Sequence, residues 1–352
     1  MPLQTEPVLT ERQLSRWRLI EDFRQCLERV FGPCQGGHPS WADRQRRLLH
    51  ADYLSLFLFG LLNPVVRTMR GLCAASHLRR VQQEICSRPV SLGSFSEAQH
   101  LLDPKLLEKV FADLAAQVQG ASPAEPRLQA RAWMAHDGTL WRALPRMSWA
   151  LYGAGRGGDS HGVKLHLSLH LLEDKPVRAT VRRGKDCERA VWHERWQKGD
   201  AYVGDRYYGE DYQLLEELAQ AFCAYVLRLR EQAVITVEEE LPLSEADRDA
   251  GVVRQAWARL GRRHPTQRVR VVWVQAEGHS LILVTNLGPE ELPAELVSLL
   301  YRRRWQVELF FRWIKCILGC RHWLAESPEG VATIAATLLA IGSPLTSIAS
   351  TT

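Results

Sequence analysis

The chain has 352 residues, of which 46% are hydrophobic and 24% are charged, a composition typical of a globular protein with one large or two medium domains. The net charge is only +5, but 38 of the 45 basic residues are arginine. Arginine suits bidentate contact with phosphate, although a GC-rich genome would produce the same excess. Eight scattered cysteines without a C-x-x-C pair, no apolar leader and no apolar stretch long enough to span a bilayer predict a cytoplasmic protein that does not enter a membrane.

Residues 1–120 are predicted to form a helical N-terminal domain. Thr10 opens a capping box with Gln13, and apolar residues then recur at helical spacing. A second helix is expected to begin at Asp103. Short segments rich in arginine lie between these helices and are typical of a helical module that contacts DNA, although a plain helical cap would have the same pattern.

A linker is predicted at residues 119–127, and after it the apolar period changes to two residues. The segments 163–172 and 177–183 alternate as a pair of strands would, and they follow a strand-like segment at 132–140. The next elements are expected at residues 187–198 (helix), 201–206 (strand), 212–221 (helix) and 223–230 (strand). Three strands in a meander followed by alternating helix and strand predict an α/β fold with a ribonuclease-H-like core.

Residues 231–285 are predicted to be a β-rich insertion in that core. An acidic segment precedes two strong strand patterns, RVRVVWV and LILVTNL, which a hairpin signal separates. The core would then consist of residues 121–230 and 286–345, with the insertion placed before the helix that follows it.

The segment 301–316, YRRRWQVELFFRWIKC, places a single carboxylate among several cations. If this segment is helical, five of its polar residues fall within an arc of roughly 80° around the helix axis. These are Tyr301, Arg304, Glu308, Arg312 and Lys315. An exposed ladder of salt bridges would have the same spacing. A concentrated basic face, however, indicates a polyanionic partner.

Two further acids follow strand-like residues, Asp137 in WMAHDGT and Asp205 in AYVGDR. Each has a plain alternative, because Asp-Gly is common in hairpin turns and an aspartate after a strand often caps a helix. Together with Glu308 they supply the oxygen ligands that hard divalent cations take. Two such ions about 4 Å apart would activate a water or a 3′-hydroxyl and stabilise the leaving oxygen of a phosphodiester. We therefore predict these three acids as catalytic residues and ligands of two Mg²⁺ ions, for which Mn²⁺ can substitute.

The spacing of Tyr301, Arg304, Glu308 and Lys315 resembles the YREK signature of DDE transposases of insertion sequence family 4. The resemblance spans residues 132–330. It also includes DGT at 137–139, VKLHL at 163–167, YVGDR at 202–206 and LVTNL at 283–287. It implies that Asp137, Asp205 and Glu308 form the catalytic set and that the tyrosine, arginine and lysine of the signature contact phosphates near the cleaved end. Arg312 and Arg206 are predicted as further DNA contacts; for Arg206, orientation of Asp205 and plain exposure to solvent are the alternatives.

The resemblance also implies a reaction and its partners. Family members nick DNA at the transposon end, form and resolve a hairpin, and join the 3′ ends to target DNA in a dimeric complex. We therefore expect double-stranded DNA as partner, both the terminal inverted repeats and the target, a homodimer, and a place at the bacterial nucleoid. The family stacks a flipped base on a tryptophan in its insertion; Trp273 lies in that region, but a core position explains it equally, and it is assigned no role.

Two alternative functions remain open. Family members usually run on for some tens of residues past the catalytic helix, whereas this chain stops at PLTSIASTT. A truncated or decayed copy that acts only as a DNA-binding protein would have this sequence. A host nuclease with the same core is the other alternative, and it predicts that no inverted repeats flank its gene.

Overall fold

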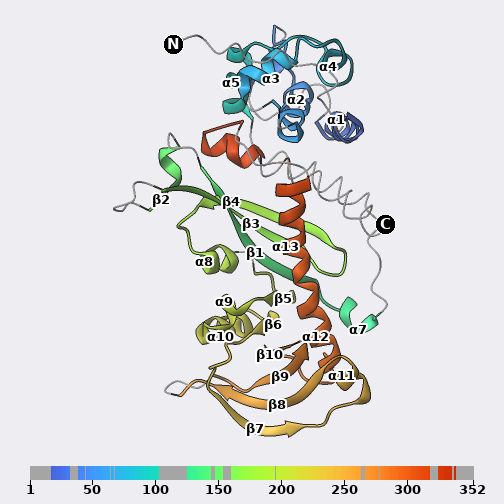
Figure 1. The fold of residues 1–352 in the computed structure, drawn as a ribbon, viewed down its shortest axis with the longest axis vertical. Coiled ribbons are helices and arrows are strands. Elements are labelled where there is room, and N and C mark those ends of the chain that lie inside the picture. The colour runs from blue at the N-terminus through green and yellow to red at the C-terminus, as the bar shows by residue number, and fades with distance from the viewer. Residues whose placement is uncertain are drawn as a thin grey trace.

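The architecture is that of a computed structural model, which describes residues 17–31, 39–43, 45–63, 65–66, 68–102, 125–143, 147–153, 160–194, 196–262, 266–276, 278–317, 324–334 and 337. A ten-stranded mixed sheet runs through the molecule, with helices on it and beyond one end of it (Figure 1). Its strands are β1 (Trp133–Arg142), β2 (Leu151–Gly153), β3 (Ser160–His170), β4 (Lys175–Arg183), β5 (Ala201–Gly204), β6 (Ala224–Arg228), β7 (Ile235–Leu241), β8 (Val252–Leu260), β9 (Val269–Ala276) and β10 (His279–Thr285). The predicted α/β class is confirmed.

The order of the strands is β2-β3-β1-β5-β6-β10-β9-β8-β7, and β4 also pairs with β3. β1, β3 and β4 form the predicted antiparallel meander. β5 then lies parallel to β1, and β6 lies parallel to β5. This meander followed by parallel strands is the element order on which the expectation of a ribonuclease-H-like core rests.

The two faces of the sheet are covered by different helices. Strand residues alternate between two apolar clusters: Ala201 and Val203 of β5 pack in one cluster, and Tyr202 packs in the other. The first face is covered by α12 (Ala294–Arg303) and α13 (Trp305–Arg312). The second face is covered by α8 (Glu188–His193), α9 (Arg206–Gly209) and α10 (Tyr212–Gln220).

The β-rich insertion has four strands and continues the core sheet, because β10 pairs antiparallel with β6. Two of these strands, β7 and β8, were not predicted. The acidic run in β7 resembles a loop in the sequence, yet its carboxylates pair with arginines of the neighbouring strand β8 and with Arg268, which directly precedes β9. Arg254 binds Glu240, Arg259 binds Glu238 and Arg268 binds Glu239. These cross-strand pairs allow charged residues to occupy a strand. The short helix α11 (Glu245–Asp249) joins β7 to β8.

The described residues between 17 and 102 form helices and no strand. They are α1 (Trp17–Phe31), α2 (His50–Leu62), α3 (Met69–Ala75), α4 (Arg79–Glu84), α5 (Leu92–Leu101) and a 3-10 turn, η2 (Pro39–Ala42). α2 is buried almost along its whole length and forms the centre of this helical part. Gln99 of α5 bonds to Ser327 near the other end of the chain. The predicted helix starts at Thr10 and Asp103 lie outside the described residues.

Two predicted elements differ from the structure. The described end of the expected linker begins a short helix, α7 (Pro126–Gln129), which Glu125 caps. The polar arc around Glu308 was placed on one helix, but the chain forms α12, then α13, and then a π-helical turn, η4 (Trp313–Ile317). No helix among the described residues is long and apolar enough to cross a membrane.

Candidate active site

Asp137 lies within β1, opposite Leu167 of β3, and not in a turn. The Asp-Gly dipeptide is therefore no hairpin here. Its Oδ1 accepts a hydrogen bond of 2.7 Å from the N–H of Gly138. Burial raises the pKa of Asp137 to about 6, the charges of Asp205 and Glu188 add to the rise, and the hydrogen bond and Arg304 oppose it. The carboxylate is thus close to two other acids.

Asp205 comes directly after β5 and caps α9. Its Oδ1 accepts the N–H of Tyr207 at 2.9 Å. β5 is the parallel neighbour of β1, and Val203 lies opposite Ala135. Asp205 and Asp137 each come two residues after this pair, so the two aspartates lie at equivalent positions of the neighbouring chain segments. The capping alternative is correct for Asp205, and it does not exclude the catalytic one, because the second carboxylate oxygen remains for a ligand.

Glu308 lies in the first turn of α13, and α13 packs on β1 and β3. Arg304 donates from Nη2 to Glu308 Oε1 at 2.8 Å. The Arg304 side chain is only 11% exposed, and its Nε is buried without a hydrogen-bond partner among the described residues. Arg304 thus joins the third acid to the neighbourhood of Asp137.

Lys315 lies in η4 and reaches β1. Its Nζ donates to Thr139 Oγ1 at 2.5 Å and to the carbonyl oxygen of Leu140 at 3.1 Å. The ammonium group also lies 5.1 Å from the centre of the Trp141 ring. Lys315 therefore contacts β1 at Thr139, two residues beyond Asp137.

The other predicted DNA contacts divide into buried and exposed residues. Tyr301 is buried in α12, with the Arg304 guanidinium 5.7 Å from its ring. Arg312 is exposed on α13, and the Arg206 side chain is 63% exposed beside Glu210. Two arginines of the same basic segment are instead tied to the protein.

Those two arginines are Arg302 and Arg303. Arg302 donates to the carbonyl oxygen of Ala250 at 2.6 Å, and Arg303 donates to that of Leu171 at 3.2 Å. The basic segment is therefore not uniformly available to a partner, a division that spacing alone does not reveal. Trp273 is half-buried against the second apolar cluster, and the Arg254 guanidinium covers its ring at 4.6 Å.

Sequence reasoning missed one acid, Glu188 at the start of α8. Its Oε1 forms an ion pair of 3.1 Å with Lys164 of β3. The same oxygen lies 2.7 Å from the position that a Cβ on Gly138 would take, closer than side chains normally approach, so glycine after Asp137 leaves room for it. An acid in the first turn of a helix is common for electrostatic reasons, and the sequence held no signal that separates Glu188 from that class.

The site has the chemistry of a divalent-cation site, because its predicted ligands are all carboxylates. Among the described residues, however, no group of three or more His, Cys, Asp or Glu side chains is gathered closely enough to hold a metal ion. Asp137 and Asp205 are close enough for the charge of one to raise the pKa of the other, whereas the Glu308 carboxylate is bound to Arg304.

A family model, "Transposase DDE domain", matches residues 131–341. A putative transposase of Sinorhizobium fredii is 30% identical over 68% of this chain and 69% of its own length. A probable transposase for an insertion sequence element of Geobacillus stearothermophilus is 28% identical over 49% of this chain and 45% of its own. A putative transposase of Escherichia coli is 42% identical over 20% of each chain.

Among solved structures, a synaptic complex of piggyBac transposase with hairpin DNA is similar with a TM-score of 0.45 and 11% identity, over 97% of this chain and 78% of that chain. A likeness of that size adds nothing to the fold, which is argued from the strand order. The family match covers more than half of the chain, and it includes Asp137, Asp205 and Glu308. The chain therefore belongs to the family of transposases with a DDE domain.

Proposed function

We propose that this transposase cuts and joins DNA phosphodiesters at a site formed by Asp137, Asp205 and Glu308. The observation that carries the proposal is the placement of Asp137 on β1 and of Asp205 directly after β5, the parallel neighbour of β1, with α13 packed on β1. In this proposal the Glu308 carboxylate leaves Arg304 and joins the two aspartates. A ladder of surface salt bridges would not need this convergence.

Two Mg²⁺ ions, or Mn²⁺ in their place, would activate the attacking oxygen and stabilise the leaving oxygen when bound to these carboxylates. For this role Asp137 must be ionised, and its pKa of about 6 leaves it so at neutral pH. Glu308 must also turn from Arg304, which then has its guanidinium free for a phosphate oxygen.

The basic residues around the acids would hold the DNA backbone. Arg312 and Arg206 are exposed to solvent, and Lys315 lies at the edge of β1 next to the acids. Tyr301 is buried beneath Arg304, so we assign it to supporting that arginine as well as to the phosphate contact that the YREK spacing implies. These contacts position the strand, and they carry no sequence information.

We further propose that the enzyme belongs to insertion sequence family 4 and moves its element by cut and paste through a hairpin intermediate. Its DNA partners would be the terminal inverted repeats and the target. A homodimer would bring two ends together, and the helical residues 1–120 would contribute to end recognition. The domain limits are those predicted above, with the core at 121–230 and 286–345 and the insertion at 231–285.

The test is cleavage of the DNA that flanks the protein's own gene, in Mg²⁺ or Mn²⁺, by wild type and by Glu308→Gln. Glu194→Gln is the matched control, because Glu194 is exposed and pairs with Arg182 away from the three acids. We expect nicks and hairpins with wild type and with the control, and none with Glu308→Gln. Equal cleavage by Glu308→Gln would refute the assignment of this acid. Binding without cleavage by any of the three would support a copy that only occupies DNA.

A further inference from the structure

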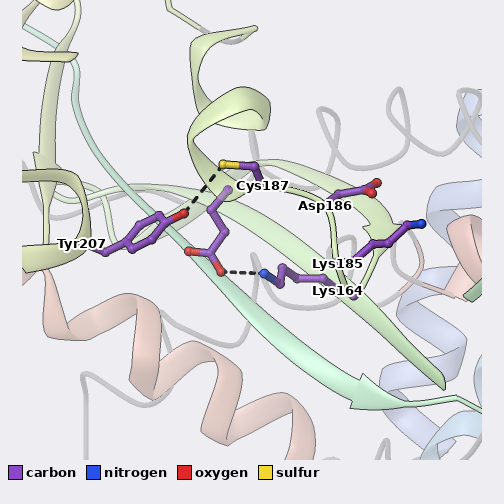
Figure 2. Close-up of a pocket in the computed structure, with 7 residues that line it drawn as sticks. Lys164, Lys185, Asp186, Cys187 and Tyr207 are labelled. Carbon is purple, nitrogen blue, oxygen red and sulfur yellow. Dashed lines mark hydrogen bonds and ion pairs between the residues drawn. The ribbon is translucent and has the colours of Figure 1, made fainter. Parts of the chain in front are cut away.

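Lys164 and Glu188 form an ion pair close to the candidate active site. Lys164 belongs to β3 and Glu188 begins α8, and Nζ of the first lies 3.1 Å from Oε1 of the second. The pair borders a pocket of about 630 Å³ that Tyr207 of α9 also lines, and Figure 2 marks the contact by the dashed line at Lys164. Neither member of the pair was predicted as a site residue.

β1 lies between this ion pair and the carboxylate of Asp137. Successive side chains of a strand point to opposite faces of its sheet. Ala135 packs in the apolar cluster that α12 and α13 cover, so Asp137, two residues later, faces the same side. His136 instead lies against α8, and Gly138 faces α8 as well. Glu188 is therefore placed behind the strand that carries the aspartate.

No side chain of β1 separates Glu188 from the strand backbone at this point, because the residue that faces α8 is Gly138. A Cβ there would lie 2.7 Å from Glu188 Oε1, closer than side chains normally approach. The charge of Glu188 also reaches Asp137, where it adds to the rise in pKa that burial causes. A negative potential that disfavours an ionised aspartate favours a doubly charged cation beside it.

The hydroxyl group of Tyr208 lies in an enclosed space near the same acids. Tyr208 is 1% exposed, and its hydroxyl has no hydrogen-bond partner among the described residues. Burial raises the pKa of this hydroxyl, and the charges of Glu188, Asp137 and Asp205 add to the rise, with Glu188 the largest of the three. The three carboxylates therefore act on one common region of the structure.

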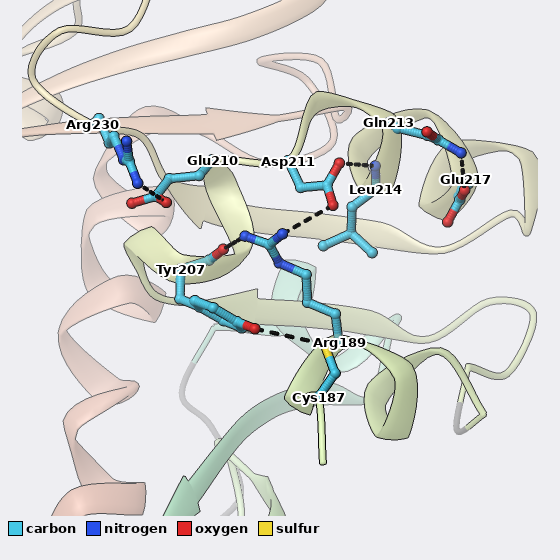
Figure 3. A network of polar contacts seen from close by, with 9 residues as sticks. All are labelled: Cys187, Arg189, Tyr207, Glu210, Asp211, Gln213, Leu214, Glu217 and Arg230. Carbon is cyan, nitrogen blue, oxygen red and sulfur yellow. Dashed lines mark hydrogen bonds and ion pairs between the residues drawn. The ribbon is translucent and has the colours of Figure 1, made fainter. Parts of the chain in front are cut away.

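The first turn of α8 is fixed relative to α9. Figure 3 shows how Arg189, the residue after Glu188, donates to the carbonyl oxygen of Tyr207 and to Asp211, the latter at 3.2 Å. The N–H of the same tyrosine is the group that Asp205 accepts. The charge of Glu188 is thus held in place with respect to both aspartates of the site.

We propose that Glu188 strengthens the binding of divalent cations at the two aspartates by its charge, without touching the ions, and that Lys164 limits this effect. The inference rests on the proposed function, since it presumes cations at Asp137 and Asp205. Outer partners of metal ligands commonly change metal affinity about 10- to 100-fold. The members of the pair should therefore act in opposite directions, whereas loss of either member of a purely structural ion pair would disturb the site in the same direction.

The first experiment measures Mn²⁺ binding through the electron paramagnetic resonance signal of the free ion. Glu188→Gln should bind Mn²⁺ about 10- to 100-fold more weakly than wild type, whereas Lys164→Met should bind it severalfold more tightly. Glu188→Asp keeps the charge and should retain most of the affinity. Because the pair borders open space, none of these changes leaves a void in a packed core. Weaker binding by both Glu188→Gln and Lys164→Met would overturn the proposal.

Matched controls come from a second ion pair between α8 and the sheet. Glu194, at the end of α8, binds Arg182 of β4 at 3.1 Å, and both side chains are exposed. Glu194→Gln and Arg182→Met should leave the affinity for Mn²⁺ unchanged. Equal losses in Glu194→Gln and Glu188→Gln would show an effect of net charge alone and would contradict the proposal. Circular dichroism shows whether each variant keeps the fold.

The second experiment repeats the titrations with Ca²⁺ as a competitor of Mn²⁺. Ca²⁺ has the same charge but takes longer bonds to more oxygen ligands than the smaller ions do. An effect of charge through the strand predicts that Glu188→Gln weakens the binding of both ions by the same factor. A loss confined to one of the ions would mean that Glu188 contacts it, and the proposed action at a distance would be wrong.

The two proposals fail in different ways. If wild type, alone or with the DNA that flanks its gene, binds Mn²⁺ no more tightly than Asp137→Asn does, the proposed function fails. If Asp137→Asn lowers the affinity while Glu188→Gln and Lys164→Met both equal wild type, only the inference on the ion pair fails.

Discussion

Arg304 binds Glu308 one helical turn away at 2.8 Å, and it does so with a guanidinium that is almost entirely enclosed. The same guanidinium lies near Asp137. Burial raises the pKa of Asp137 to about 6, and the positive charge of Arg304 opposes this rise. One cation therefore faces two of the acids that the reaction would use. This arrangement makes the ionisation of Asp137 depend on a residue of another element.

Replacing Arg304 by alanine is expected to raise the pKa of Asp137 further, because the opposing positive charge is removed while burial and the neighbouring acids remain. The pH at half-maximal Mn²⁺-dependent nicking should then move upward by about 0.5 to 1 unit. The pH profile of residual nicking is the measurement. Arg312→Ala is the control, since Arg312 is exposed on the same helix; an equal shift in both variants would contradict the prediction.

Asp137→Asn is expected to stabilise the fold while it abolishes cleavage. The folded pKa of about 6 lies above the ordinary 3.8, so the ionised carboxylate destabilises the folded state above pH 6, and this penalty is absent below about pH 4. Asparagine can still accept the Gly138 N–H. The free energy of unfolding should thus rise by about 1 to 3 kcal/mol at pH 8. Thermal melts at pH 8 and pH 4 test this, and a gain of equal size at both pH values would show another cause.

Cations of the segment 301–316 should differ in their effect on DNA binding. Arg312 is exposed, so Arg312→Ala should lower the slope of log affinity against log salt by about 1. Arg302 is tied to the carbonyl oxygen of Ala250, so Arg302→Ala should leave the slope unchanged and lower stability instead. Titrations at several salt concentrations, together with melts, measure both quantities. The prediction is wrong if Arg302→Ala changes the slope as much as Arg312→Ala.

Gly209→Ala is expected to disturb the helix that Asp205 begins. A Cβ at this position would lie 2.1 Å from the carbonyl oxygen of Arg228 on β6, and backbone cannot give way as a side chain can. The cost should be about 1 to 3 kcal/mol or more in the free energy of unfolding. Gly93→Ala in α5 is the control, because nothing lies within 4 Å of its Cβ, and it should be neutral or slightly stabilising. Chemical denaturation of both variants is the measurement.

Much of the core was predictable because its strands alternate strictly. Leu165, Leu167 and Leu169 of β3 are all buried, and this period of two fixed both the strand and its inner face. Asp137 and Asp205 were predicted as site residues because each follows strand-like residues. Glu308 was predicted through its spacing from Arg304 and Lys315; the fold places Arg304 near Asp137 of β1, and Lys315 contacts Thr139 of the same strand.

What escaped prediction depends on contacts between distant segments. β7 carries Glu238, Glu239 and Glu240, and it pairs with β8 while arginines that lie elsewhere in the chain bind these three carboxylates. Glu188 has no local signal at all, since its importance comes from a glycine 50 positions earlier in the chain that leaves space for it. The pocket lined by Tyr207 is likewise a product of three elements that only the fold brings together.

The pairing of β10 with β6 makes the insertion a structural part of the core. Removing residues 231–285 would also remove β10, and the N–H and C=O groups of β6 on the side away from β5 would lose their partners. An unpaired edge strand of this kind tends to pair with strands of other molecules. Attempts to produce a minimal catalytic fragment should therefore yield aggregates unless the edge is covered. We therefore expect the smallest well-behaved fragment of this protein to include residues 231–285.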